Sequence, residues 1–142
     1  MNNSSALRGV ATVSFFAFDV DAAKRWYAEL LGSDPYFEVP GYAEFRIGDY
    51  ELELGIIDKR YVSGNLGTEP AGAVIYWHVD DIQKTFDRLL SMGATKHEEI
   101  RDRGNGFITA SVVDPFGNIL GIMFNPHYLG VMKAQKGEGN SL

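Results

Sequence analysis

Apolar and polar residues follow the same order twice along this chain. Residues 16–32 and 77–93 each begin with an apolar segment, continue through a pair of aspartates, and end in an amphipathic stretch closed by glycine. The two copies lie 61 residues apart, and the span of 13 residues from Asp19 to Gly32 is repeated from Asp80 to Gly93. A duplication of this kind predicts two matched halves around a shared cleft, so the function is sought between them.

The amphipathic stretch of each copy predicts a helix. Its apolar residues recur every three or four positions, which places them on one helical face. In each copy, either aspartate of the pair could accept hydrogen bonds from the free amides of the first turn. Glycine readily takes the left-handed conformation that ends a helix, so Gly32 and Gly93 are the expected ends. We expect capping, and no catalysis, from the four aspartates, which are Asp19, Asp21, Asp80 and Asp81.

Alternating apolar and polar residues predict strands around both helices. The expected strands cover residues 10–18, 36–39, 42–47 and 50–57 in the first copy, and 73–79, 95–101, 106–113 and 118–124 in the second. Tight-turn composition separates several of them, at Pro40-Gly41, Gly48-Asp49 and Asp114–Gly117. Each copy is therefore a βαβββ module, and the fold class is α+β.

We expect a single domain, residues 1–142, made of the two modules in tandem. Module one covers about residues 8–58 and module two about residues 71–126. The segment 58–70 between them is polar and contains glycine and proline, which is typical of a linker. The polar, glycine-rich residues 127–142 predict a flexible tail that frays.

Composition excludes several classes of protein. The chain has 142 residues, no cysteine and a formal net charge of −6. Without cysteine there are no disulfides or thiolate metal sites, and a reducing cytoplasm is the expected location. The first ten residues lack the apolar core of a secretory signal, and no run of about 18 apolar residues predicts a membrane span. Acidic and basic residues are mixed along the chain, which disfavours nucleic acid as a partner.

A set of short motifs occurs in a fixed order. Asp19 and Tyr27 precede Leu31-Gly32 in the first copy, Val79-Asp80 precedes Met92-Gly93 in the second, and Asp114–Asn118 follows. In this order, over about residues 8–126, the chain resembles the vicinal oxygen chelate superfamily, which holds glyoxalase I, bleomycin-resistance proteins and extradiol dioxygenases. The resemblance implies paired βαβββ modules whose curved mixed sheets surround a central cleft, commonly completed in a homodimer.

The resemblance also implies four metal-ligand positions, most of which hold side chains unsuited to a metal. Three of them fall on Thr12, Val74 and Gly121. The fourth keeps an acid, as Glu53 or, with a shifted register, Glu51. Divalent ions need three or four protein ligands in fixed geometry, which one carboxylate and a threonine hydroxyl do not supply. We therefore expect no bound metal and no cofactor.

The three histidines of the chain do not have the spacing of a relocated metal site. No two stand at i, i+2 on one strand or at i, i+4 on one helix. His78 shares strand parity with cleft positions, His97 is expected on the surface of an edge strand, and His127 in a loop after the last strand. We expect each to have a structural role.

Strand alternation predicts the residues of a ligand pocket. If Thr12 faces the cleft, every second residue of its strand does so too, and the same parity applies to the matching strands. The expected pocket residues are Thr12, Ser14, Phe16, Glu53, Val74, Tyr76, His78, Gly121 and Met123. Apolar walls with few polar groups are typical of sites for small organic molecules, and Gly121 is expected to leave room there. The alternative is that these aromatic side chains fill a collapsed core.

Two functions are compatible with this pattern. The first, which we favour, is a metal-independent protein of the bleomycin-resistance type that holds an apolar or aromatic small molecule in the inter-module cleft, as a homodimer. The second is a glyoxalase-like lyase, isomerase or dioxygenase. It would hold a metal at a non-standard site that includes Glu53 and His78, or use one of them as a general base. Motifs of serine hydrolases and phosphate loops are absent.

Overall fold

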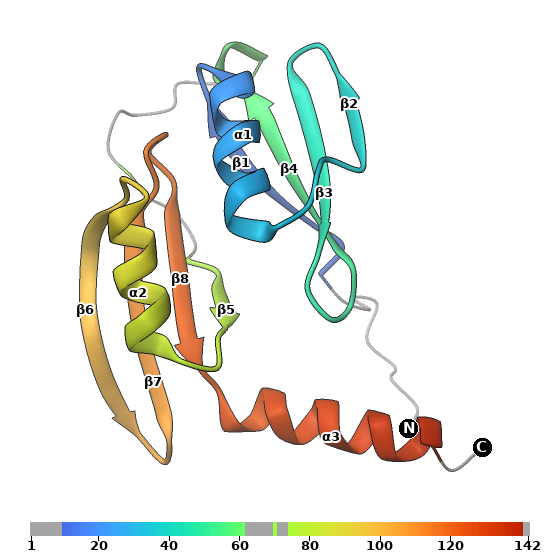
Figure 1. The fold of residues 1–142 in the computed structure, drawn as a ribbon, viewed down its shortest axis with the longest axis vertical. Coiled ribbons are helices and arrows are strands. Elements are labelled where there is room, and N and C mark those ends of the chain that lie inside the picture. The colour runs from blue at the N-terminus through green and yellow to red at the C-terminus, as the bar shows by residue number, and fades with distance from the viewer. Residues whose placement is uncertain (1–9, 62–69, 71–73, 141–142) are drawn as a thin grey trace. The chain divides into compact units, whose positions relative to one another are not determined.

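A computed structural model describes residues 10–61, 70 and 74–140 of the chain, the last four of them by their backbone alone. The chain divides into two compact units, residues 1–67 and residues 68–142. Each unit contains one four-stranded mixed sheet and a helix between its first two strands (Figure 1). The predicted α+β fold of two tandem βαβββ modules is confirmed, and each unit is described by itself below.

Unit 1 runs through five main elements and a short 3₁₀ turn. They are β1 (Thr12–Ala17), α1 (Val20–Leu31), β2 (Phe37–Val39), β3 (Tyr42–Ile47), β4 (Leu52–Asp58) and the turn η1 (Lys59–Tyr61). The strand order in the sheet is β1-β4-β3-β2. The β1–β4 pair is parallel and the other two pairs are antiparallel, so β1 and β2 are the edges.

Unit 2 repeats this arrangement and adds a helix. Its elements are β5 (Tyr76–His78), α2 (Ile82–Ser91), β6 (Thr95–Gly104), β7 (Phe107–Val113), β8 (Ile119–Phe124) and α3 (Pro126–Asn140). The strand order is β5-β8-β7-β6, with β5 and β8 parallel and the other pairs antiparallel. In each unit, the first and last strands therefore form the parallel pair.

The predicted strands occur in the structure, with differences at their ends. β3 has the predicted bounds, whereas β4 begins at Leu52 because Glu51, with φ 55°, belongs to the preceding turn. Asp58, expected in the linker, closes β4. Residue 73 of the predicted fifth strand and linker residues 62–69 lie outside the described part of the chain.

The core of each unit lies between its helix and one face of its sheet. On β1, Val13, Phe15 and Ala17 are buried, and α1 packs against β1, β3 and β4. Tyr27 of α1 is buried as well, with its ring centroid 5.9 Å from that of Phe15. In unit 2, α2 packs against β6, β7 and β8 in the same way. The alternate residues of each strand are thereby left on the face that the helix does not cover.

The structure selects one aspartate of each pair as the helix cap. The Asp19 carboxylate accepts a hydrogen bond from the backbone N–H of Ala22 at 3.0 Å, and the Asp81 carboxylate accepts one from Lys84 at 3.0 Å. Gly32 ends α1 with φ 71°, as predicted. The two capping aspartates are 62 residues apart, so the modules correspond with an offset one residue larger than the sequence repeat suggests.

The segment expected to fray forms a helix instead. Residues 126–140 make up α3, so the loop predicted around His127 is wrong. The Asn125 side-chain oxygen accepts a hydrogen bond from the backbone N–H of Tyr128 at 2.9 Å, and Pro126 occupies the first helical position. Asn as cap and Pro as first residue are a strong helix-start signal, which the polar composition downstream obscured.

None of the helices in the described ranges has both the length and the apolar character that a transmembrane span requires.

The Asp81→Ala variant should lower the free energy of unfolding by about 1 kcal/mol, because the Lys84 amide loses its acceptor. Chemical denaturation followed by circular dichroism measures this. The matched control is Asp87→Ala, an exposed position of the same helix whose carboxylate accepts a hydrogen bond from Gln83. An equal loss in both variants would contradict the assignment of Asp81 as the cap.

Candidate functional site

Four of the predicted pocket residues share the uncovered face of the unit 1 sheet. Thr12 pairs with Glu53 across the β1–β4 ladder, and the Thr12 hydroxyl donates to a Glu53 carboxylate oxygen at 2.8 Å. Ser14 is exposed and Phe16 is half-buried on the same side of β1. The structure therefore brings together the residues that strand parity predicts for this module.

Two residues that the sequence analysis missed lie on the same face. The Tyr42 hydroxyl donates to a Glu44 carboxylate oxygen at 2.6 Å. Burial, the hydrogen bond to Glu44 and the nearby charges of Glu44 and Glu53 raise the pKa of Tyr42 to about 12. The phenol is therefore a neutral hydrogen-bond donor at ordinary pH. The alternation of buried and less buried residues along β3 places Tyr42 and Glu44 on this face.

The unit 2 residues likewise lie on adjacent strands. Tyr76 pairs with Gly121, and His78 pairs with Met123, across the parallel β5–β8 ladder. Val74 precedes β5 and is half-buried. These residues belong to unit 2, and the four described first belong to unit 1.

The space beside Gly121 is occupied, contrary to the expectation that this glycine leaves room. A Cβ atom at Gly121 would lie 2.8 Å from the Ile75 carbonyl oxygen and 2.8 Å from Cδ1 of the Tyr76 ring. Unit 1 shows the same packing at Gly55, where a Cβ would lie 2.8 Å from the Tyr42 hydroxyl. Glycine is therefore needed at both positions for the close approach of a tyrosine ring.

The imidazole of His78 is engaged on all sides. The backbone N–H of Asn125 donates to Nδ1 at 3.1 Å, and Nε2 lies 3.0 Å from a carboxylate oxygen of Asp80. The ring stacks on Tyr128 with centroids 4.9 Å apart, and its side chain is only 8% exposed. Neither nitrogen is free to accept a substrate proton or bind a metal, which argues against His78 as a catalytic base.

The other metal candidates do not gather into a site. Nδ1 of His97 lies 2.9 Å from the hydroxyl of Ser111, His97 is exposed on the edge strand β6 as predicted, and His127 is exposed on α3. Glu51 lies in the turn before β4. In the parts of the chain that the structure describes, no three His, Asp or Glu side chains are placed to hold an ion.

A hollow of about 490 Å³ opens elsewhere in unit 1, where α1 begins. Its lining residues are Phe18, Asp19, Val20, Asp21, Lys24, Glu38, Val39, Pro40, Gly41, Tyr42, Ala43, Asp58 and Arg60. The nine predicted pocket residues are not among them.

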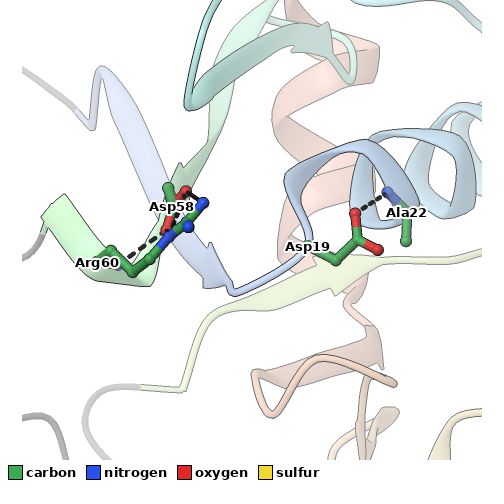
Figure 2. A network of polar contacts seen from close by, with 4 residues as sticks. All are labelled: Asp19, Ala22, Asp58 and Arg60. Carbon is green, nitrogen blue, oxygen red and sulfur yellow. Dashed lines mark hydrogen bonds and ion pairs between the residues drawn. The ribbon is translucent and has the colours of Figure 1, made fainter.

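Charged groups that line this hollow make contacts within unit 1. Figure 2 shows the cap of α1 at Asp19 and the contact between Arg60 and Asp58. Nε of Arg60 lies 3.0 and 3.1 Å from the two carboxylate oxygens of Asp58. Arg60 lowers the pKa of the buried Asp58 carboxyl below its ordinary value. Lys24 of α1 donates to Glu38 of β2 at 2.8 Å. The contact between Lys24 and Glu38 connects α1 to the sheet, and we assign the hollow no ligand.

Comparison with known proteins places the fold among solved structures. Residues 9–122 match the family model described as the Glyoxalase/Bleomycin resistance protein/Dioxygenase superfamily. A glyoxalase-related enzyme from Fulvimarina pelagi is similar with a TM-score of 0.68 and 23% identity, over 84% of this chain and 90% of that one. No curated protein matches.

Two further structures extend this likeness. Lactoylglutathione lyase from Agrobacterium tumefaciens has a TM-score of 0.66 and 19% identity, over 85% of this chain and 96% of that one. A bleomycin resistance determinant encoded on the transposon Tn5 has a TM-score of 0.61 and 23% identity, over 82% and 97%. At these identities the likeness is one of fold.

The Gly121→Ala variant should be destabilised by about 1–3 kcal/mol, because its methyl group overlaps the Tyr76 ring and the Ile75 carbonyl oxygen. The control is Gly130→Ala in α3, where nothing lies within 4 Å of the added Cβ and helix propensity favours alanine. Thermal denaturation of both variants measures the difference. If Gly121→Ala proved as harmless as the control, the space beside Gly121 would be open.

Proposed function

The chain belongs to the Glyoxalase/Bleomycin resistance protein/Dioxygenase superfamily, and on that premise we propose that it binds a small organic molecule without using a metal ion. The residues proposed to contact the ligand lie on the uncovered face of each unit. They are Thr12, Ser14 and Phe16 in unit 1, and Tyr76 and Met123 in unit 2. The proposal includes a homodimer, as in the arrangement that the resemblance implies.

The occupied position at Gly121 is the observation that carries this proposal. The resemblance implies a metal-binding carboxylate there, and the Tyr76 ring fills the space that such a side chain would need. Gly55 of unit 1, which pairs with Ser14 as Gly121 pairs with Tyr76, is filled by Tyr42 in the same way. A carboxylate at position 121 would therefore have to displace the Tyr76 ring.

The side chains of the unit 1 face suit a small organic ligand. Phe16 offers an apolar ring, while Thr12, Ser14 and Glu53 offer a few hydrogen-bonding groups on neighbouring strands. Apolar surface supplies affinity, and sparse polar groups orient the molecule. The neutral phenol of Tyr42 and its acceptor Glu44 extend the polar part of the face.

A metal-free lyase or isomerase is the second candidate, and the state of Glu53 favours it. The Glu53 carboxylate accepts a hydrogen bond from Thr12, is half-buried, and has no ion-pair partner among the described residues. A carboxylate in this state is available as a general base. His78 is not, because both ring nitrogens are engaged.

Protein purified without chelators should contain only substoichiometric nickel, zinc, iron and manganese by elemental analysis. Its melting temperature should not change when these ions are added, because the described residues offer no three-ligand site. Stoichiometric metal that is lost in Glu53→Ala would overturn the proposal of metal-independent binding.

A screen of aromatic and amphipathic compounds by thermal shift should yield ligands whose binding depends on the unit 1 face. Ser14→Trp, which fills that face at an exposed position, should weaken binding by at least about tenfold, or 1.4 kcal/mol. Calorimetric titration measures the affinity. Arg25→Trp, at an exposed position of α1, should bind as the unchanged protein does.

Equal affinity in Ser14→Trp and Arg25→Trp would place the ligand elsewhere. Turnover of a bound compound that disappears in Glu53→Gln, with its affinity retained, would favour the metal-free enzyme instead.

A further inference from the structure

The junction between β8 and α3 is held by the imidazole of His78. Asn125, which caps α3 with its side chain, donates its backbone N–H to Nδ1 of His78 at 3.1 Å. One turn later, the Tyr128 ring lies parallel to the imidazole, with an interplanar angle of 14°. The ring centroid of Phe124, the last residue of β8, lies 5.5 Å from that of His78. The first turn of α3 is therefore attached to β5 through one side chain.

The hydrogen bonds determine where the proton of the neutral ring lies. A backbone N–H can only donate, so Nδ1 must present its lone pair to Asn125. Nε2 then carries the proton and donates it to Asp80 at 3.0 Å. A second proton can enter the ring only at Nδ1, where it would face the N–H of Asn125 and replace an acceptor by a donor.

The charged neighbours of the ring do not compensate for this loss. Asp80 favours a charged imidazole, but its side chain is 92% exposed, and an ion pair in contact with water contributes little. The adjacent Asp81 is committed to the cap of α2, and His127 on α3 is exposed. The loss of an acceptor by the part-buried N–H of Asn125 is costly by comparison.

We propose that His78 is a pH-sensitive latch for α3. With a neutral ring, Nδ1 and the stacked face hold Asn125 and Tyr128, and the first turn of α3 is attached to unit 2. A second proton on the ring breaks the bond to Asn125 and releases the first turn of the helix. The attached form is therefore favoured at the higher pH and is lost when acid adds the second proton. The latch does not depend on the proposed ligand.

Hydrogen exchange measured by mass spectrometry tests the latch on the full chain. Protection factors of residues 126–136, corrected for the intrinsic pH dependence of exchange, are compared at about pH 7.5 and about pH 5 with those of α1 as internal reference. We expect the ratio of α3 to α1 protection to fall by at least about fivefold at the lower pH.

Two variants separate the latch from a general effect of acid. In His78→Asn, the side-chain oxygen can replace Nδ1 as an acceptor that does not titrate, so the ratio should be the same at both pH values. In His78→Phe, the ring remains but the acceptor is lost, so the ratio should be low at both. An unchanged ratio in the original protein would overturn the proposal, and so would an equal fall in His78→Asn. If His78→Phe does not fold, the ratios of the original protein and of His78→Asn at the two pH values still test the proposal.

Discussion

Packing of one helix against one face of a four-stranded sheet is the constraint on which each half of this protein depends. Because side chains alternate along a strand, burying Val13, Phe15 and Ala17 under α1 leaves the residues between them on the opposite face. In unit 2, α2 covers one face of β6, β7 and β8 in the same way. The residues available for a ligand are thus decided by the core, and a shift of one residue in register would exchange the two faces.

On the uncovered face of each sheet, a tyrosine ring lies against a glycine. Tyr76 fills the space over Gly121, and Tyr42 fills the space over Gly55. Both glycines occupy corresponding places in the parallel ladders, opposite Tyr76 and Ser14. Each of these positions therefore carries an aromatic ring, which supports the proposal of an organic ligand.

Local signals made much of the fold predictable from the sequence, whereas the errors at Gly121 and His78 come from long-range contacts. The duplicated order of strand, aspartates, helix and glycine identifies both modules, but it leaves open whether Asp80 or Asp81 caps, since each precedes the helix. Asn125-Pro126 is a helix start that composition further along concealed. The filling of Gly121 could not be inferred, because Tyr76 is 45 residues away and meets it only through the β5–β8 register. The engagement of His78 by Asn125 is a contact of the same kind, 47 residues apart.

Anomalous diffraction from crystals grown with zinc or nickel would locate any metal ion that the protein binds. Metal-independent binding predicts ordered density for the Tyr76 ring against Gly121, and no anomalous peak beside Thr12 and Glu53. A peak coordinated by the Glu53 carboxylate, with the Tyr76 ring turned away from Gly121, would contradict it.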